Sequence, residues 1–324
     1  MAQTLLTKTI PGLSMQLSPI FFGTAMDPVN QGGAGAPALL DSVLEAGVNA
    51  FDCARSYGLA EETLGRWILE RGVRDQVVIL SKCGDIRQGK VMVNRSVIRE
   101  QLAKSLDALR VNCIDIYLLH RDDPNTPVEE FVETLNEARR EGMIRLFGVS
   151  NWTHRRIEEA NRYAAEKGLA GFAVSSPNFG LACQLRDLWG GGCVTLSGPE
   201  NREARAWYTR NGMPVIAYSS LGRGFFSGRF RSGDWEGARA VLDAYAQLGY
   251  LYPENMDRLA RAEKLAERDG CSVPEIAMRY VFGSDMNVFA VVSTSSRERL
   301  QMNLRAAANP LSAGDVAYLE GMDK

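Results

Sequence analysis

The sequence is poor in the residues that build metal sites and disulfide frameworks. Its 324 residues include only two histidines, His120 and His154, and none of its six cysteines belongs to a C-x-x-C pair. Structural zinc needs Cys and His ligands at short spacing, so we expect no metal site. A chain of this length does not need a disulfide framework to fold. We therefore predict free cysteines, several of them packed inside apolar runs as small hydrophobic residues.

Neither an excess of one charge nor a long apolar run marks the chain. Thirty-seven Lys and Arg are balanced by 39 Asp and Glu, for a formal net charge of −2. This balance gives no basic excess that would attract nucleic acid or a membrane surface. Residues 1–11 lack an apolar signal core, and no stretch approaches the roughly 18 apolar residues of a membrane span. We expect a cytoplasmic protein, and the sequence gives no indication of its oligomeric state.

Eight short apolar runs alternate with amphipathic segments along the chain. These predicted strands are residues 20–23, 50–53, 77–82, 113–120, 145–150, 172–175, 215–219 and 288–293. Between them, segments such as residues 97–109 carry apolar residues at helical spacing. Thr126 and Ser272 each begin a capping-box pattern that predicts a helix start. Regular alternation of strands and helices predicts a parallel sheet with helices outside it.

Eight strands favour closure into an α/β (β/α)8 TIM barrel over an open doubly wound sheet. Such a barrel typically needs about 250 residues or more. The open sheet usually carries G-x-G-x-x-G after its first strand, and the run at residues 32–35 does not match that fingerprint. We predict a single domain, residues 1–324, with an N-terminal β-hairpin at residues 7–17. Long loops, often functional, are expected after strands six and seven, at about residues 178–200 and 222–255.

Chemically capable residues stand at the ends of three successive predicted strands. Asp52, Lys82 and His120 end strands two, three and four, and Tyr57 follows Asp52 by five residues. The active site of such a barrel lies at the carboxyl ends of its strands, so the four are expected on one rim. Each has an ordinary structural explanation: a loop cap, a lysine reaching water, a turn aromatic and a hydrogen-bonded core histidine.

Together, however, the four residues suit the reduction of a carbonyl group. That reaction needs a proton donor, and tyrosine, with a reference pKa of about 10, is a weak acid at neutral pH. A lysine cation beside Tyr57 is expected to lower its pKa. A buried Lys82 would need the carboxylate of Asp52. A neutral His120 can hydrogen-bond and orient the substrate oxygen.

Four sequence blocks resemble the signature blocks of the aldo-keto reductase superfamily. They are residues 51–58 (FDCARSYG), 79–82 (ILSK), 115–120 (DIYLLH) and 147–151 (FGVSN). The resemblance implies an oxidoreductase that transfers hydride between a nicotinamide cofactor and an aldehyde or ketone, or in reverse on the alcohol. It also implies that Tyr57 is the general acid/base, that Lys82 tunes it, that Asp52 pairs with Lys82 and that His120 positions the carbonyl.

The resemblance further implies a cofactor site. Its expected residues are Gly23, Thr24, Asp52, Ser150, Asn151, Ser176, Tyr218, Ser219, Leu221, Gly224, Gly228, Ser293, Thr294, Arg299 and Asn303. Ser150 and Asn151 match the pair that holds the nicotinamide carboxamide, and Tyr218 matches the aromatic that stacks on the ring. Residues 219–229 resemble the segment that contacts the pyrophosphate through glycines and backbone N–H groups.

The predicted cofactor site departs from the family pattern at two strand ends. Ser176 stands where glutamine is usual, and the hydroxyl-rich segment 292–296 lacks the usual basic residue. Arg299, helped by Arg297, could still pair a 2′-phosphate through two hydrogen bonds. This favours NADP(H), with NAD(H) possible.

The substrate is the least determined part of the prediction. Met26, Trp152 and Phe179 are expected at the pocket rim, where aromatic residues suit an apolar or ring-shaped substrate. The absence of a long C-terminal tail suits sugars or small carbonyls. Two alternatives stay open: a cofactor-binding regulatory protein resembling potassium-channel β-subunits, and a barrel isomerase or aldolase in which Lys82 forms a Schiff base.

Overall fold

The protein folds around eight strands whose order is that of a closed barrel, β1 to β8 in sequence. The computed structural model describes residues 6–86, 91 and 93–322. The strands are β1 (Ile20–Gly23), β2 (Ala50–Asp52), β3 (Val78–Cys83), β4 (Ile114–Leu119), β5 (Ile144–Ser150), β6 (Val174–Ser176), β7 (Val215–Ala217) and β8 (Val288–Val292). The pairs whose register is determined are parallel. The prediction of a (β/α)8 barrel is confirmed.

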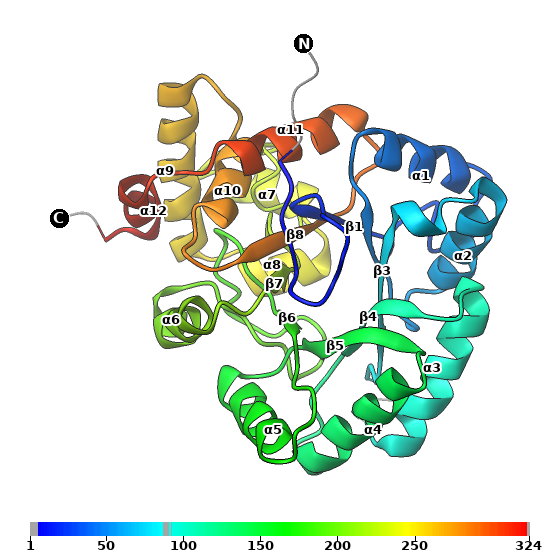
Figure 1. Cartoon of the computed structure of the whole chain (residues 1–324). Coiled ribbons are helices and arrows are strands. Elements are labelled where there is room, and N and C mark those ends of the chain that lie inside the picture. Colours follow the sequence, from blue (N-terminus) through cyan, green and yellow to red (C-terminus); the bar gives the residue numbers. More distant parts are fainter. Residues whose placement is uncertain (1–5, 87–90, 92, 323–324) are drawn as a thin grey trace. The chain divides into compact units, whose positions relative to one another are not determined.

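Twelve α-helices and two short 3-10 helices lie in the described part of the chain (Figure 1). The α-helices are α1 (Ala36–Glu45), α2 (Ala60–Arg71), α3 (Arg95–Leu109), α4 (Val128–Arg140), α5 (His154–Glu166), α6 (Arg202–Asn211), α7 (Trp235–Val241), α8 (Ala244–Tyr250), α9 (Pro253–Asp269), α10 (Val273–Phe282), α11 (Arg297–Ala308) and α12 (Ala313–Glu320). The 3-10 helices are η1 (Arg74–Gln76) and η2 (Pro199–Asn201). Among these described helices, none combines the length and the apolar character needed to cross a membrane.

The chain divides into two compact units, which are described separately. The first unit comprises Met1–Ser175 and Val291–Leu300, and the second comprises Ser176–Ala290 and Gln301–Lys324. This division leaves the expected single domain as a prediction.

In the first unit, β1 to β5 are buried and α1 to α5 follow one another outside them (Figure 1). Every residue of β1, β2, β3 and β4 is buried, which accounts for the continuous apolar runs in the sequence. The register aligns Phe22 with Phe51 and Phe51 with Ile79. Gly148 of β5 is required by packing, because a Cβ there would lie 2.1 Å from the carbonyl oxygen of Val174.

The predicted N-terminal hairpin forms a short antiparallel bridge. The backbones of Lys8 and Leu17 exchange two hydrogen bonds of 2.8 Å. The Asn49 side chain donates to the Gln16 carbonyl at 2.9 Å and accepts from the Ser18 N–H at 3.0 Å. Because Asn49 directly precedes β2, the hairpin is tied to the amino end of that strand, away from the strand ends that carry the candidate site.

One of the two residues predicted to begin a capping box caps its helix, and the other does not. The Ser272 hydroxyl accepts from the Glu275 N–H and caps α10. The Thr126 prediction was wrong: α4 has Pro127 at its N-cap, without a side-chain cap. The Thr126 hydroxyl donates instead to the Val93 carbonyl at 3.0 Å.

In the second unit, the segment after β6 is a long loop, whereas the segment after β7 is not. Residues 177–198 contain no helix or strand, as predicted. The expected loop at residues 222–255 was wrong, because α7 and α8 lie within it. Asp234 and Asp243 cap these helices by accepting from the N–H groups of Gly237 and Ala246.

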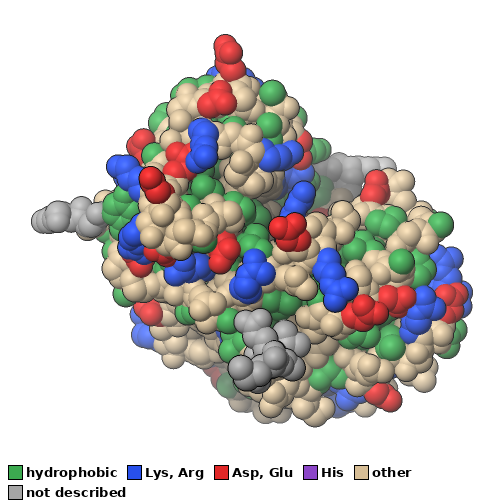
Figure 2. Space-filling model, turned by 90° about the horizontal axis from the view of Figure 1, so that it is seen from above, with side chains coloured by type: hydrophobic (Ala, Val, Ile, Leu, Met, Phe, Trp, Pro, Cys, Tyr) green, Lys and Arg blue, Asp and Glu red, His purple; other side chains and the backbone are tan. Residues whose placement is uncertain are grey.

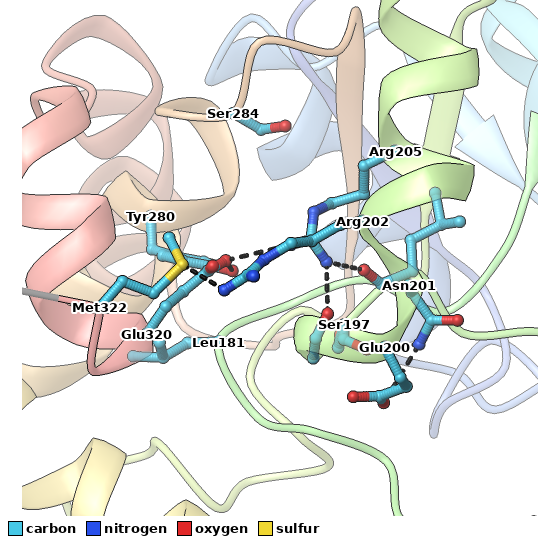
Figure 3. Close-up of polar contacts among 12 residues, drawn as sticks. Leu181, Ser197, Glu200, Asn201, Arg202, Arg205, Tyr280, Ser284, Glu320 and Met322 are labelled. Carbon is cyan, nitrogen blue, oxygen red and sulfur yellow. Dashed lines mark hydrogen bonds and ion pairs between the residues drawn. The ribbon is translucent and has the colours of Figure 1, made fainter.

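A polar cluster in the second unit ties the loop after β6 to the last helix. Arg205 of α6 donates to the carbonyls of Leu196 and Gly198 at 2.7 and 2.6 Å. Its guanidinium lies 3.6 Å from Glu320 of α12, whose carboxylate also accepts from the Tyr280 hydroxyl at 2.6 Å. Figure 3 shows these side chains converging from α6, α10 and α12. The cluster fixes where residues 196–198 run.

The face drawn in Figure 2 carries Lys and Arg side chains interspersed with Asp and Glu rather than gathered by sign. This distribution fits the near-zero formal charge of the sequence.

Candidate active site

The Lys82 ammonium joins the predicted catalytic residues of the first unit. Its Nζ lies 2.6 Å from Asp52 Oδ1 and 2.9 Å from the Cys53 carbonyl oxygen. The same Nζ lies 3.3 Å from the Tyr57 hydroxyl and 4.8 Å from the centre of the Tyr57 ring. Lys82 and Asp52 are both almost fully buried. The carboxylate and the phenol therefore share one cation.

The sheet register explains why Lys82 and Asp52 meet. Asp52, the last residue of β2, is aligned with Leu80 of β3. Lys82 follows Leu80 by two residues and therefore emerges on the same side of the sheet. A side chain as long as lysine can reach back from there to the Asp52 carboxylate.

A tight turn after β2 places Tyr57. The Arg55 N–H donates to the Lys82 carbonyl at 3.0 Å, and the Tyr57 N–H donates to the Ala54 carbonyl at 3.0 Å. Gly58 has a φ of +59°, and a Cβ there would lie 2.6 Å from the Asn30 carbonyl oxygen. Glycine is thus needed next to Tyr57, both for the left-handed backbone and for the close approach.

Burial and the neighbouring charges set the protonation states of this group. Burial raises the pKa of Tyr57 to about 12, and the Lys82 cation only partly opposes this shift. Lys82 lowers the pKa of Tyr57, as expected, but burial raises it by more, so the net pKa lies above the ordinary value. Burial also disfavours the Lys82 cation, but the stabilising effect of Asp52 and Tyr57 on that cation is larger than the effect of burial. The pKa of Lys82 is therefore raised. At neutral pH the group holds a protonated phenol beside an ammonium.

His120 lies beside Tyr57, just after β4. The backbone N–H of His120 donates to the Cys83 carbonyl at 2.7 Å, and the rings of His120 and Tyr57 meet edge to face with centres 5.8 Å apart. Burial, with Lys82 as the next cause, lowers the pKa of His120 to about 3. The imidazole is neutral at neutral pH, so it can form a hydrogen bond but carries no charge.

Ser150 and Asn151, the predicted carboxamide pair, lie at the end of β5 in the same unit. Asn151 Nδ2 donates to the His120 carbonyl at 3.3 Å and to Ser150 Oγ at 3.1 Å. Asn151 has a φ of +60°, a left-handed conformation that non-glycine residues seldom adopt. Strained backbone of this kind clusters at functional sites.

The ends of β1 and β8 bring Gly23, Thr24 and Ser293 together. The Thr24 hydroxyl donates to the Asp52 carbonyl at 2.9 Å, and the Ser293 hydroxyl donates to the Gly23 carbonyl at 2.9 Å. A Cβ on Gly23 would lie 2.5 Å from Ser293 Oγ. This part of the predicted site is closely packed around a glycine backbone.

Two further predicted cofactor residues of the first unit follow β8. Thr294 is buried, and its hydroxyl accepts from the Ser296 N–H at 3.1 Å. Arg299, in the first turn of α11, is exposed, and its N–H donates to Ser296 Oγ at 3.2 Å. A hydroxyl-rich turn thus leads into a helix with an exposed arginine near its start.

The second unit holds the other predicted cofactor residues: Ser176, Tyr218, Ser219, Leu221, Gly224, Gly228 and Asn303. Ser219 has a φ of +56°, a second left-handed non-glycine residue at a strand end, and Gly224 and Gly228 have φ values of +94° and +76°. Asn303 of α11 is buried, and its Oδ1 accepts no hydrogen bond from the described residues. A buried acceptor without a donor is costly and suits a ligand that supplies an N–H group.

The predicted substrate residues differ in their surroundings. Met26 is half-buried in the segment after β1. Trp152 is fully buried, and its ring meets those of Phe131 and Phe172 edge to face, each at 5.3 Å. Phe179, in the second unit, is buried with its ring 5.9 Å from that of Tyr280. Trp152 is packed like a core residue, but its buried indole Nε1 has no hydrogen-bond partner among the described residues. Its contact with a substrate stays a prediction.

Asp85 is a residue of the site that sequence reasoning missed. Its Oδ2 lies 3.6 Å from His120 Nδ1, and its Oδ1 lies 3.4 Å from Arg121 Nε. The signal was available, because Asp85 follows Lys82 by three residues and so lies just beyond the end of the same strand. From the sequence alone, however, a single aspartate in a loop looks the same as an ordinary turn residue.

No group of three or more His, Cys, Asp or Glu side chains within residues 6–86, 91 and 93–322 is arranged to hold a metal ion. All six cysteines are free thiols.

Comparison with known proteins places this chain in a family. The model of the Aldo/keto reductase family matches residues 20–324, nearly the whole chain, so the protein belongs to that family. Aldo-keto reductase str7 from Strobilurus tenacellus is 26% identical over 288 residues, which cover 86% of this chain and 78% of that protein. The resemblance drawn from the four sequence blocks is confirmed. Membership indicates an oxidoreductase acting on carbonyl groups, and the family generally uses nicotinamide cofactors.

Proposed function

We propose that the protein is a cytoplasmic NADP(H)-dependent reductase of an aldehyde or ketone, working in reverse on the alcohol, with Tyr57 as general acid/base. The observation that carries the proposal is the buried Lys82 ammonium, which contacts both Asp52 at 2.6 Å and the Tyr57 hydroxyl at 3.3 Å. Few other functions need a buried cation that is shared between a carboxylate and a phenol, and such perturbed groups cluster at functional sites.

In the reductive direction, Tyr57 donates its phenolic proton to the carbonyl oxygen as that oxygen gains charge. The high pKa of Tyr57 keeps the proton in place until the reaction needs it. Lys82 then stabilises the tyrosinate, and Asp52 holds Lys82 in place. His120, neutral and beside Tyr57, orients the substrate. The nicotinamide cofactor supplies the hydride.

Features of both units support a dinucleotide as the cofactor. Asn151 and Ser219, the left-handed residues after β5 and β7, fall in the segments predicted to hold the nicotinamide end. Asn303, whose buried Oδ1 accepts no hydrogen bond within the described part of the chain, falls where the adenine end is predicted. Ser176 would replace the usual glutamine with a shorter side chain. The exposed Arg299 favours NADP(H), because a guanidinium can pair a 2′-phosphate with two hydrogen bonds.

Lys82 is a poor candidate for the Schiff-base alternative. A nucleophilic lysine must lose its proton, whereas the pKa of Lys82 is raised by Asp52 and Tyr57 against the effect of burial. A sugar or another small carbonyl compound remains the proposed substrate class.

The test is NADPH oxidation against a panel of aldehydes and ketones, with Tyr57→Phe as the matched control. The proposal expects turnover on at least one carbonyl and a loss of about 10²- to 10⁴-fold in kcat without Tyr57. Tight NADPH binding without turnover on any carbonyl would favour the regulatory alternative.

A further inference from the structure

Glu61 is a buried carboxylate that the proposed reaction does not use directly. It lies in the first turn of α2, four residues after Tyr57, and is only 1% exposed. Its Oε1 accepts from the Ser81 hydroxyl at 2.6 Å, and its Oε2 pairs with the Arg55 guanidinium. Burial raises the pKa of Glu61, and Ser81 and Arg55 oppose that shift. A buried charge is tolerated when it is paired and hydrogen-bonded, and both carboxylate oxygens of Glu61 have such a partner.

The two partners of Glu61 stand next to residues of the candidate active site. Ser81 directly precedes Lys82 on β3, and Arg55 precedes Tyr57 by two residues. Successive side chains of a strand point to opposite faces of the sheet, so Glu61 holds β3 from the face opposite to the Lys82 ammonium. One carboxylate thus joins the strand that supplies the lysine to the turn that supplies the phenol.

Backbone hydrogen bonds join the same strand, turn and helix. The Arg55 N–H donates to the Lys82 carbonyl at 3.0 Å, and the Ala60 N–H donates to the Tyr57 carbonyl at 3.1 Å. The turn is therefore tied to β3 at one end and to the start of α2 at the other. A change in how Glu61 connects α2 to β3 is then passed on to the Tyr57 hydroxyl.

Small displacements matter at this site. The Lys82 Nζ and the Tyr57 hydroxyl lie 3.3 Å apart, close to the upper limit of a hydrogen bond, so a shift of a few tenths of an ångström would separate them. Misplacing a catalytic group by about 1 Å can cost roughly 10²-fold in rate. Fold stability gives no comparable reason for a carboxylate here, because well-packed apolar residues in place of a buried ion pair are often neutral or stabilising.

We propose that Glu61 is a positioning residue, which acts through Arg55 and Ser81 to hold the Tyr57 hydroxyl within hydrogen-bond distance of Lys82. This inference rests on the proposed function, because it assigns Glu61 a part in the step in which Tyr57 donates its proton. Glu61 acts on that step only through the position of Tyr57. Its loss should therefore lower kcat and leave KM and cofactor affinity nearly unchanged.

Two substitutions of Glu61 separate its position from its charge. Glu61→Met fills a similar space without the two polar contacts, and kcat on a carbonyl that the wild type reduces should fall about 10- to 100-fold. Glu61→Gln can keep both contacts, because its amide oxygen can accept from Arg55 while its NH2 group donates to the Ser81 oxygen. It should therefore retain kcat within about fivefold. NADPH affinity, measured by fluorescence titration of the same samples, should stay within about threefold in both variants.

Glu62→Met is the matched control. Glu62 follows Glu61 on α2 and pairs with the same Arg55 guanidinium at 3.1 Å, but its side chain is 44% exposed. This variant should keep kcat within about twofold. If Glu62→Met lowers kcat as much as Glu61→Met does, the specific role of Glu61 is refuted. If Glu61→Gln falls as far as Glu61→Met, the effect is one of charge, and positioning is refuted.

Ser81→Ala removes only the contact to β3 and leaves the ion pair with Arg55 in place. It should lower kcat about three- to tenfold. The double variant Glu61→Met/Ser81→Ala should be no slower than Glu61→Met, because both changes break the same connection. Ser81→Ala also serves if Glu61→Met does not fold: an unchanged kcat in Ser81→Ala would then overturn the proposal.

Crystal structures of the wild type and Glu61→Met test the position of Tyr57 without any turnover. The distance from Lys82 Nζ to the Tyr57 hydroxyl should exceed about 3.5 Å in the variant, against 3.3 Å in the wild type. An unchanged distance, or a wild-type kcat in Glu61→Met, would refute the inference and leave the proposed function standing. No turnover by the wild type on any carbonyl would count against the proposed function, and the distance would still decide the role of Glu61.

Discussion

Replacing Asp52 with Asn removes one charge of a buried ion pair and leaves the other behind. Side-chain exposure is only 3% for Lys82 and 6% for Asp52, so water can compensate little for the lost contact. Removing one partner of such a pair costs about 3–5 kcal/mol of folding free energy. The asparagine oxygen and the Cys53 carbonyl, 2.9 Å from Nζ, still accept from the lysine, so we expect the lower end of that range.

The pH dependence of this loss has a definite sign. In the wild type the pKa of Lys82 is raised, so its contribution is fully present below the unfolded value of about 10.4 and is lost only as pH rises through the higher folded value. In Asp52→Asn, burial acts without the carboxylate, and the folded pKa of Lys82 should drop below the unfolded one. The free energy of unfolding of the variant should then increase as pH rises toward about 10, and the difference in stability between the variant and the wild type should shrink.

Urea unfolding followed by circular dichroism at about pH 7 and about pH 9.5 measures both effects. The double variant Asp52→Asn/Lys82→Met is the control, because it removes both charges. It should be more stable than Asp52→Asn alone at neutral pH. The reasoning would be refuted if Asp52→Asn were less stable than the wild type by under about 1 kcal/mol, or if this difference in unfolding free energy grew with pH.

Three further outcomes are expected. Tyr57→Phe should lower kcat by about 10²- to 10⁴-fold, while its NADPH affinity, measured by fluorescence titration, stays within about threefold of the wild-type value. If kcat and NADPH affinity fall by the same factor, Tyr57 has a role in cofactor binding instead. Arg299→Ala should weaken NADPH binding about tenfold or more but leave the affinity for NADH unchanged. Arg305→Ala on the same helix is the control. If the affinity for NADPH does not change in Arg299→Ala, Arg299 does not bind the 2′-phosphate. Gly148→Ala should destabilise the fold by about 1–3 kcal/mol or more, because its Cβ would lie 2.1 Å from the Val174 oxygen, and an unchanged melting temperature would contradict that.

The barrel was predictable because its strands are buried on both sides and read as apolar runs. Asp52 and Lys82 stood out as charges at or next to the ends of such runs, and the register of β2 and β3 then brings them together. The helices α7 and α8 were missed even though Asp234 and Asp243 precede them, because short helices show little periodicity.

Other features depend on contacts that no local pattern contains. Pro127, not Thr126, occupies the N-cap of α4, because the Thr126 hydroxyl donates a hydrogen bond to the carbonyl of Val93, which lies 33 residues earlier in the chain. The direction of the Tyr57 pKa shift depends on how far burial outweighs Lys82, and burial is a property of the whole fold. The approach of Asp85 to His120 joins the ends of two strands and has no counterpart in residue spacing.

The proposal that this group of residues performs hydride transfer is tested most directly by isotope transfer. NADPH carrying deuterium on the reactive C4 position is incubated with a carbonyl substrate, and the product alcohol is analysed by mass spectrometry. The account predicts one deuterium on the carbinol carbon with the wild type and almost no labelled product with Tyr57→Phe. Product without the label, or equal labelling by Tyr57→Phe at the wild-type rate, would contradict it.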